Sequence, residues 1–387
     1  MKWERKTINE VCNVGDGAHA SIKRTTEGFQ YLTSKNFKLD GLDLNKVDFI
    51  SEVDYFKHFR DDSKAITKPK SNDVLLSIIG SLGAPYLVKE EDVFGLSSSV
   101  SILRPKNEII EPRFLFYWIK SNEFQSSINN IKSGVAQSFL SLGMIKSLPV
   151  IYPKELPTQR KIASILSAYD DLIENNLKRI KLLEEKAFVS YKLLVKSEKF
   201  KLEELYDTSS GGTPSRTNAE YFTGEINWFK SKELADSILL ESEEKITEQA
   251  VDKSSAKLFP AGSVIMAMYG ATIGKLGLLS QPSTTNQACC AIIQKDEIQS
   301  NYYILNWLIE NREYVLSFRM GAAQENISQQ IIRNLVVSIP KESDLKIFNQ
   351  EMQPIYHLIK NLHQQNTKLR EARDIILPKL MNGQIEV

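Results

Sequence analysis

Cysteine and histidine are scarce in this sequence of 387 residues, which has three cysteines and four histidines. Two of the cysteines, Cys289 and Cys290, are adjacent, and an odd number with this spacing makes a poor disulfide framework and a poor zinc site. No two histidines stand four residues apart, so one helix face cannot offer a pair of histidine ligands. We therefore predict no bound metal, three buried cysteines that include Cys12, and a reducing, cytoplasmic environment.

Long apolar runs are also missing. The longest stretch, from Val74 to Val88, is interrupted by Gly80, Gly83 and Pro85, among others, and is too short to span a bilayer. The charged N-terminus has no apolar run behind it, so a secretory signal is not expected. The sequence predicts a protein that does not associate with a membrane.

Motifs that carry catalysis are absent or incomplete. A DNA methyltransferase needs an Asn/Asp-Pro-Pro-aromatic site, and the sequence has no Pro-Pro pair. The segment from Gly270 to Lys275 has three residues between its glycines where a phosphate-binding loop has four, and Leu276 stands where serine or threonine must reach magnesium. No serine lies in a Gly-x-Ser-x-Gly turn. We therefore predict that the chain is not an enzyme and binds no cofactor of its own.

A large excess of basic charge is missing as well, because the formal net charge is +1. This balance argues against a protein that grips DNA alone through bulk electrostatic attraction. A net charge near zero is still compatible with local clusters of basic residues that contact DNA.

The sequence does contain a long internal repeat. Residues 134–155 (GVAQSFLSLGMIKSLPVIYPKE) align without a gap with residues 321–342 (GAAQENISQQIIRNLVVSIPKE), and 10 of the 22 positions are identical. Unrelated segments would share roughly one or two. Upstream, QYLTSKNF at residues 30–37 matches NWFKSKEL at residues 227–234. Two units of this length indicate a duplicated domain rather than a solenoid.

Each repeat reads as a mixed domain followed by a long helix. Short β-rich runs end at glycine, and a helical patch surrounds Trp118 in the first repeat and Trp307 in the second, both of which we expect in the core. The predicted segments are residues 1–155 and 198–342 for the two domains, and 156–197 and 343–387 for the two linker helices. The fold class is therefore α+β, with two homologous mixed α/β domains separated by two long antiparallel coiled-coil helices in a pseudo-two-fold repeat.

The two linker stretches carry seam residues at alternating steps of four and three, which is typical of coiled-coil packing. The seam residues are Ile162, Leu166, Tyr169, Ile173, Asn176, Ile180, Leu183, Ala187 and Leu194 in the first stretch, and Phe348, Met352, Ile355, Ile359, Leu362, Asn366, Leu369 and Ile376 in the second. We expect Pro157 in the first turn of its helix, a kink at Pro354, and Pro378 with Gly383 at the end of the second helix.

Two asparagines lie in the middle of the seams. A polar residue at such a position costs stability but fixes the register of the helices. Antiparallel packing would bring Asn176 and Asn366 nearly opposite each other, and we predict that they set the register.

With these residues in view, the chain resembles the DNA specificity subunits of type I restriction-modification enzymes over its whole length. The block from Gly-x-Ala-Gln to Pro-Lys-Glu before each long helix is typical of them. So are the segments SGGTPSR (residues 210–216), ILSAYDDLIENN (165–176) and LPKLMNGQIEV (377–387). The second linker departs from the usual opening, since it has Leu-Lys-Ile-Phe at residues 345–348.

The resemblance implies that the two domains are target-recognition domains, each reading one half of a bipartite site in double-stranded DNA, with the helices as a spacer. It also implies two modification subunits, which carry S-adenosylmethionine-dependent adenine methylation, and endonuclease/translocase subunits that join the complex. S-adenosylmethionine, ATP and magnesium would belong only to these partners.

Residues for DNA contact follow from the repeat. Polar residues that occur in both halves are expected to position the DNA backbone, and basic or amide residues in loops without a counterpart are expected to contact bases. The first group is Lys35, Lys232, Gln137 and Gln324. The second group is Arg24, Lys57, Arg60, Arg216, Asn218 and Lys275.

A scaffold protein is the alternative interpretation, as a specificity-like remnant bound to another defence complex. An adjacent methyltransferase gene would distinguish the two, because a specificity subunit should have one and an orphan would not.

Overall fold

The computed structural model describes residues 2–39, 41–133, 139–296, 299–321 and 325–387. Contacts divide the chain into two compact units, which are Met1–Leu172 with Leu369–Val387 (unit 1) and Ile173–Lys368 (unit 2). Each long helix therefore contributes residues to both units. These two units are defined by contacts, whereas the four segments predicted above are consecutive along the chain. The boundaries of those four segments therefore stay a prediction.

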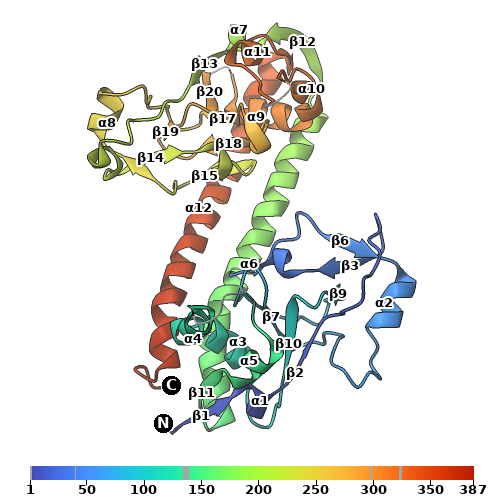
Figure 1. Cartoon of the computed structure of the whole chain (residues 1–387). Coiled ribbons are helices and arrows are strands. Elements are labelled where there is room, and N and C mark those ends of the chain that lie inside the picture. Colours follow the sequence, from blue (N-terminus) through green and yellow to red (C-terminus); the bar gives the residue numbers. More distant parts are fainter. Residues whose placement is uncertain (1, 40, 134–138, 297–298, 322–324) are drawn as a thin grey trace. The chain divides into compact units, whose positions relative to one another are not determined.

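Unit 1 contains three main sheets (Figure 1). A four-stranded antiparallel sheet has the order β2-β10-β7-β8, a three-stranded sheet has the order β6-β3-β9, and β1 pairs with β11. The strands are β1 (Trp3–Thr7), β2 (Cys12–Asp16), β3 (Phe29–Leu32), β6 (Asp48–Ile50), β7 (Val74–Ser77), β8 (Pro85–Leu87), β9 (Phe94–Leu96), β10 (Val100–Pro105) and β11 (Pro149–Pro153), with a short pair β4 (Phe37–Lys38) and β5 (Gly41–Leu42).

Unit 2 repeats this plan. Its larger sheet has the order β13-β20-β17-β18-β15, its three-stranded sheet has the order β16-β14-β19, and β12 pairs with β21. The strands are β12 (Lys196–Lys201), β13 (Tyr206–Ser210), β14 (Ile226–Phe229), β15 (Ser237–Leu239), β16 (Lys245–Ile246), β17 (Val264–Ala267), β18 (Leu276–Leu279), β19 (Thr284–Thr285), β20 (Cys289–Gln294) and β21 (Val336–Pro340). The duplication seen in the sequence is thus a duplication of the sheets.

Short helices cover the sheets of both units. Unit 1 has α1 (Ile8–Val11), α2 (Glu52–His58), α3 (Pro112–Lys120), α4 (Asn122–Ser133) and α5 (Leu142–Ser147), and unit 2 has α7 (Leu202–Leu205), α8 (Glu248–Asp252), α9 (Asn301–Glu310), α10 (Arg312–Leu316) and α11 (Gln329–Arg333). Trp118 and Trp307 are both buried, as predicted, and so are the three cysteines, which are free.

The structure explains why certain residues are identical in the two halves of the repeat. Ser141 and Ser328 correspond, and each side chain caps a helix by accepting a hydrogen bond from the backbone N–H three residues later. The repeated isoleucine, leucine and valine that follow are fully or almost fully buried in both units; these residues are Ile145, Leu148 and Val150, and Ile332, Leu335 and Val337. Capping and core packing therefore account for the strongest part of the sequence repeat.

The two long helices are α6 (Leu156–Leu193) and α12 (Glu342–Met381). Pro157 lies in the first turn of α6, as expected. The helix ends at Leu193, before the predicted boundary at residue 197, because Lys196–Lys201 pair with β21 as β12. Helix α12 begins at Glu342 and continues through Pro354.

The prediction that Pro378 ends the second helix is wrong, because α12 continues to Met381. A proline removes only one backbone donor, and the residues around it are held by packing. Leu377, Leu380 and Met381 are all buried in the core of unit 1. Gly383, with a φ of 75°, lies just beyond the end, as expected.

A polar contact joins α6 and α12 in each unit, and the order of the two contacts along the helices fits an antiparallel pair, because Asp170 precedes Asn176 whereas Arg373 follows Asn366. In unit 2 the side-chain amide of Asn176 donates to the side-chain Oδ1 of Asn366 over 2.9 Å, and both residues are buried. In unit 1 the guanidinium of Arg373 lies 2.5 Å from the carboxylate of Asp170, which also accepts a hydrogen bond from the Tyr117 hydroxyl over 2.7 Å. Arg373 occupies a seam position, and its side chain is 8% exposed. The Asp170 side chain is 29% exposed, so solvent screens part of this interaction, and the pair is only partly buried.

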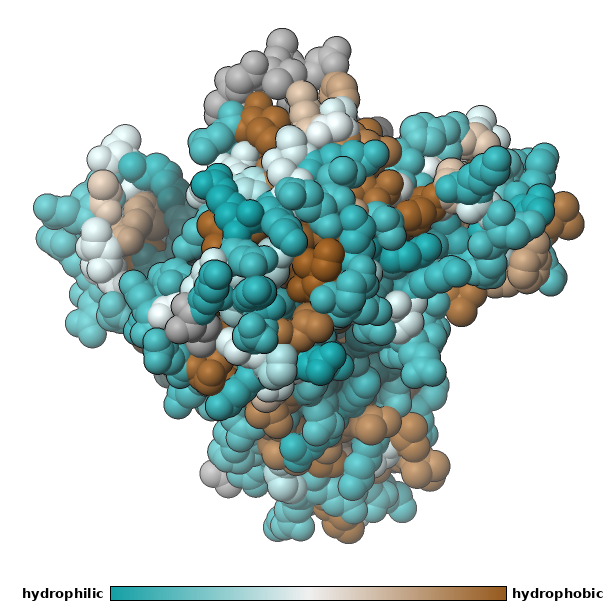
Figure 2. Space-filling model, turned by 90° about the horizontal axis from the view of Figure 1, so that it is seen from below, coloured by the Kyte–Doolittle hydropathy of each residue, from teal (hydrophilic) through white to brown (hydrophobic). Residues whose placement is uncertain are grey.

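The surface is mostly hydrophilic on the face in Figure 2, where apolar side chains are interspersed among polar ones. Such dispersed apolar residues are normal for a protein surface. Among the described residues, no helix combines the length and the apolar character needed to cross a membrane.

Candidate nucleic-acid interface

The repeated Ser-Lys pairs lie in equivalent 3-10 turns. Turn η1 (Ser34–Asn36) follows β3, and turn η3 (Ser231–Glu233) follows β14. Three equivalent backbone hydrogen bonds occur near each turn: one joins the end of the turn's strand to the residue after β9 or β19, one joins the residue before β10 or β20 to the residue after β7 or β17, and one joins that residue to the segment before α5 or α11. They are Ser97 N–Leu32 O, Ile78 N–Ser99 O and Leu140 N–Ile78 O in unit 1, and Asn286 N–Phe229 O, Met268 N–Ala288 O and Ile327 N–Met268 O in unit 2.

The two lysines of these turns differ in their surroundings. Lys35 is exposed, and no hydrogen bond or ion pair of its side chain is found within the described part of the chain. Lys232 is also exposed, but its ammonium lies 2.6 Å from the carboxylate of Glu243. A DNA phosphate that contacts Lys232 must compete with this carboxylate. Gln137 and Gln324, the other predicted backbone contacts, lie outside the described residues.

Reversing the charge of either lysine should weaken binding to all DNA sequences on the order of tenfold, because a phosphate contact carries no sequence information. The slope of log affinity against log salt should fall in magnitude by about one for Lys35→Glu. Titrating target and non-target DNA at several salt concentrations measures both quantities. Lys154→Glu and Lys341→Glu, an equivalent exposed pair, serve as controls. A change confined to the preferred bases would contradict the assignment to the phosphate backbone.

Arg24 is held firmly at the surface of unit 1. Its Nε donates to Asp48 over 3.0 Å, and its Nη1 donates to the carbonyl oxygen of Ile22 over 2.7 Å. The central carbon of its guanidinium lies 4.0 Å from the centroid of the Tyr31 ring. Its side chain nevertheless stays 38% exposed.

Arg216 has corresponding contacts in unit 2. Its Nη1 lies 2.5 Å from the carboxylate of Glu244, and its guanidinium lies 4.1 Å from the ring centroid of Phe222 and 5.1 Å from that of Trp228. Its side chain is 54% exposed. Arg24 and Arg216 were expected to lack counterparts, which is wrong: each stacks on an aromatic residue of the central strand. The loops before these strands differ in length, so sequence alignment could not pair the two arginines.

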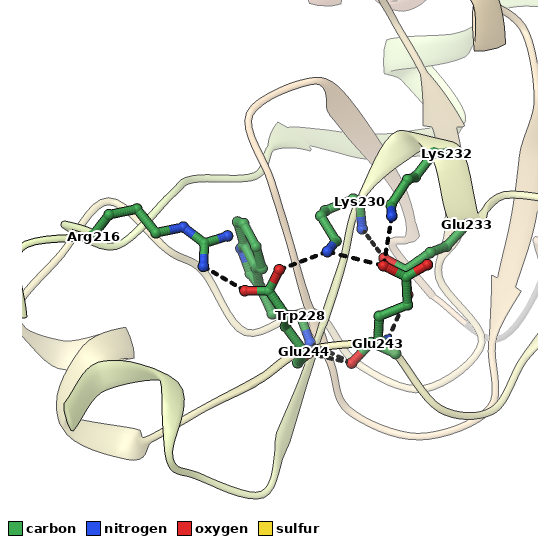
Figure 3. A network of polar contacts seen from close by, with 8 residues as sticks. Arg216, Trp228, Lys230, Lys232, Glu233, Glu243 and Glu244 are labelled. Atoms are coloured by element: carbon green, nitrogen blue, oxygen red, sulfur yellow. Dashed lines mark hydrogen bonds and ion pairs between the residues drawn. The ribbon is translucent and has the colours of Figure 1, made fainter. Parts of the chain in front are cut away.

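The carboxylates in unit 2 belong to a chain of alternating charges. In Figure 3 it runs from Arg216 through Glu244, Lys230 and Glu243 to Lys232. Hydrogen bonds from Arg216 and Lys230 lower the pKa of Glu244 to about 2, and bonds from Lys232 and Lys230 lower the pKa of Glu243. Both carboxylates are therefore ionised at neutral pH.

The remaining predicted base contacts are not members of these clusters in the contacts of the described residues. Lys57 is exposed on α2, and Arg60 pairs with Asp62 at 2.5 Å. Lys275 lies 3.0 Å from Asp236, a carboxylate that it shares with Arg312. The side chain of Asn218 accepts a hydrogen bond from the backbone N–H of Glu220 and so caps the 3-10 turn η2 (Ala219–Phe222). This contact gives Asn218 a structural role that its sequence position did not reveal.

Within the described ranges, no group of three or more histidine, cysteine, aspartate or glutamate side chains could hold a metal ion.

Comparisons with known proteins agree on one family. A family model described as "Type I restriction modification DNA specificity domain" matches residues 1–185 and again residues 195–373. The chain is 25% identical over 309 residues to the type I restriction enzyme MjaIX specificity subunit of Methanocaldococcus jannaschii, covering 73% of this chain and 71% of that protein. It is 22% identical over 401 residues to the HindI specificity subunit of Haemophilus influenzae, covering 82% of this chain and 87% of that protein.

The fold is also similar to a solved structure. The crystal structure of the type I restriction-modification S subunit from M. genitalium matches with a TM-score of 0.59 at 13% identity, covering 98% of this chain and 96% of that one. At this level of identity the likeness concerns the fold alone.

Proposed function

Because the chain belongs to the family of type I restriction-modification DNA specificity subunits, we propose that its two units each read one half of a bipartite DNA target. The observation that carries this proposal is the duplication of all three sheets, together with an exposed lysine turn and a stacked arginine in each unit. Two equivalent sites in one chain suit a target that consists of two separate half-sites.

The chemistry of the complex belongs to the partner subunits in this proposal. Two modification subunits transfer the methyl group of S-adenosylmethionine to adenine, and endonuclease/translocase subunits use ATP and magnesium. The chain itself contributes sequence recognition, without catalysis and without a cofactor of its own, and the assembly works in the cytoplasm. The balanced charge of +1 supports this division, because such a chain gains little bulk attraction to DNA by itself.

The long helices have two tasks in this proposal, which are to set the gap between the half-sites and to dock the modification subunits. Their exposed faces carry apolar side chains that the seams do not use. These side chains are Leu172 and Ile375 in unit 1, and Leu177, Leu182, Val189, Leu193, Ile347 and Leu358 in unit 2. Leu182, Val189 and Leu193 recur on α6 at steps of seven and four and so share one helix face, and such a face suits contact with another protein.

Reconstitution tests the proposed function. The purified chain alone should bind DNA weakly and transfer no methyl group from radiolabelled S-adenosylmethionine. Adding the modification subunits should produce methylation at one bipartite sequence, and the modification subunits alone should show no such preference. Methyl transfer by the isolated chain would refute the proposal that it is not an enzyme.

A further inference from the structure

The two stacked arginines belong to one three-residue arrangement that occurs in both units. Tyr31 in β3 and Trp228 in β14 hold the same place in the central strand of the three-stranded sheet, and each ring is buried. A carboxylate residue lies opposite each aromatic residue, within the neighbouring strand β6 in unit 1 and directly before the neighbouring strand β16 in unit 2. Asp48 is the direct partner of Tyr31 in the strand register, and the backbone N–H of Trp228 donates to the carbonyl oxygen of Glu244.

The arginine reaches this place through a different loop in each unit. Arg24 stands seven residues before Tyr31, whereas Arg216 stands twelve residues before Trp228. In both units the guanidinium lies over the ring and bonds the facing carboxylate, and that of Arg216 lies nearer still to the ring of Phe222. The same three kinds of group therefore meet through loops of different length, which indicates a requirement for the arrangement itself.

Stacking and the ion pair fix the guanidinium but leave much of it available. Arginine has five N–H donors. Protein contacts use the Nε donor and one Nη1 donor of Arg24, and one Nη1 donor of Arg216. Adjacent N–H groups remain on each guanidinium, and both side chains are partly exposed. A planar fork with fixed orientation is suited to two parallel hydrogen bonds.

Electrostatics favours a base over a phosphate as the acceptor at Arg24. A phosphate close to this guanidinium would also approach the carboxylate of Asp48, and the two anions would repel each other. Beside Arg216 the ammonium of Lys230 lies 2.7 Å from the carboxylate of Glu244 and offsets this repulsion, so the argument for a base there rests on the fixed planar guanidinium. The major-groove edge of guanine is uncharged and presents O6 and N7, the two acceptors that arginine binds in pairs. Because guanine is uncharged at this edge, the carboxylate can hold the guanidinium in place without repelling the base that the guanidinium binds.

We propose that Arg24 and Arg216 each read one guanine, Arg24 in the half-site of unit 1 and Arg216 in the half-site of unit 2. Tyr31 with Asp48, and Trp228 with Glu244, are their positioning residues. This inference rests on the proposed function, since it assigns a base to each of the two sites.

The test uses full-length chains assembled with the modification subunits, and methylation of a randomised DNA library measures the preference at every base pair. Arg24→Lys keeps the positive charge but removes the planar guanidinium, which can donate two parallel hydrogen bonds. It should lower the preference for guanine at one base pair of one half-site by about 5- to 150-fold and leave the other half-site unchanged. Arg216→Lys should do the same in the opposite half-site. Arg5→Lys, an exposed arginine of β1 in a different sheet, is the control and should change neither.

Variants of the carboxylates test the positioning role. Asp48→Asn should relax the same base pair as Arg24→Lys, and the double variant should add little further loss, because both changes disturb one contact. Glu244→Gln should behave in the same way with Arg216→Lys.

Three outcomes would overturn the inference. A uniform loss of affinity with a smaller salt slope would make the arginines phosphate contacts. If the variants had a lower melting temperature but an unchanged base preference, the two arginines would only stabilise the fold by packing on the aromatic rings. Relaxed preference at a base other than guanine would refute the assigned base. Failure of the proposed function is a separate result, because the unaltered complex would then show no bipartite preference.

Discussion

Removing seven residues from each long helix should shorten the gap between the two half-sites by about three base pairs. The deletions are Asn176 to Leu182 in α6 and Leu362 to Lys368 in α12. Each helix loses about 10 Å at ~1.5 Å per residue, which corresponds to about three base pairs at ~3.4 Å each. The half-site sequences themselves should stay the same, because no strand of either unit is altered.

The packing of the helices explains why the shortened chain should still fold. Seven residues are two turns of a coiled coil, so the seam keeps its pattern. Ile173 then takes the place of Ile180 against unit 2, and Leu369 takes the place of Leu362. The contact between Asp170 and Arg373 in unit 1 is kept. Both asparagines leave together, so neither is left without its partner in the seam.

Sequencing the methylated sites in cells that carry the shortened chain and its modification subunits measures the gap. The matched control removes Asn176 to Leu182 alone. This single deletion displaces α6 against α12 by seven residues and separates Asp170 from Arg373, so methylation should be lost. Robust methylation with an unchanged gap after the double deletion would mean that the helices do not set the spacing.

Much of the fold could be predicted from the sequence, because the duplication left a gapless match where caps and core residues are under the strongest constraint. Ser141 with Ser328, and Ile145 with Ile332, illustrate this. The seams of the helices were predictable for the same reason, since apolar periodicity is a local property. The role of Asn176 and Asn366 in fixing the register stays a prediction, although the two side chains are hydrogen bonded.

Contacts between residues far apart in the chain were not predictable. Arg373 was left out of the seam because charge does not fit an apolar pattern, and only the fold brings it to Asp170. Arg24 and Arg216 were each predicted to contact bases, but their equivalence was missed for a related reason, because they reach their aromatic partners through loops of unequal length. A search for an arginine before each repeated strand aromatic would have found both.

Exchanging one domain should change one half-site and leave the other intact. In unit 1 the domain packs on its own parts of the long helices, where Ile162, Leu166, Leu377 and Leu380 join its core. A chimera that takes residues 1–172 together with 369–387 from a relative keeps this core whole. Replacing residues 1–155 alone should give the same specificity at lower stability, because the foreign domain then meets unmatched helix residues.

The methylation pattern of the chimera with residues 1–172 and 369–387 exchanged is the most direct test of the account, in cells that also carry the modification subunits. If each unit reads its own half-site, sequencing should show one half of the target replaced by that of the relative. The other half and the gap should match the parent. A chimera that folds and supports methylation but changes both halves, or neither, would contradict the claim that the two units read DNA separately.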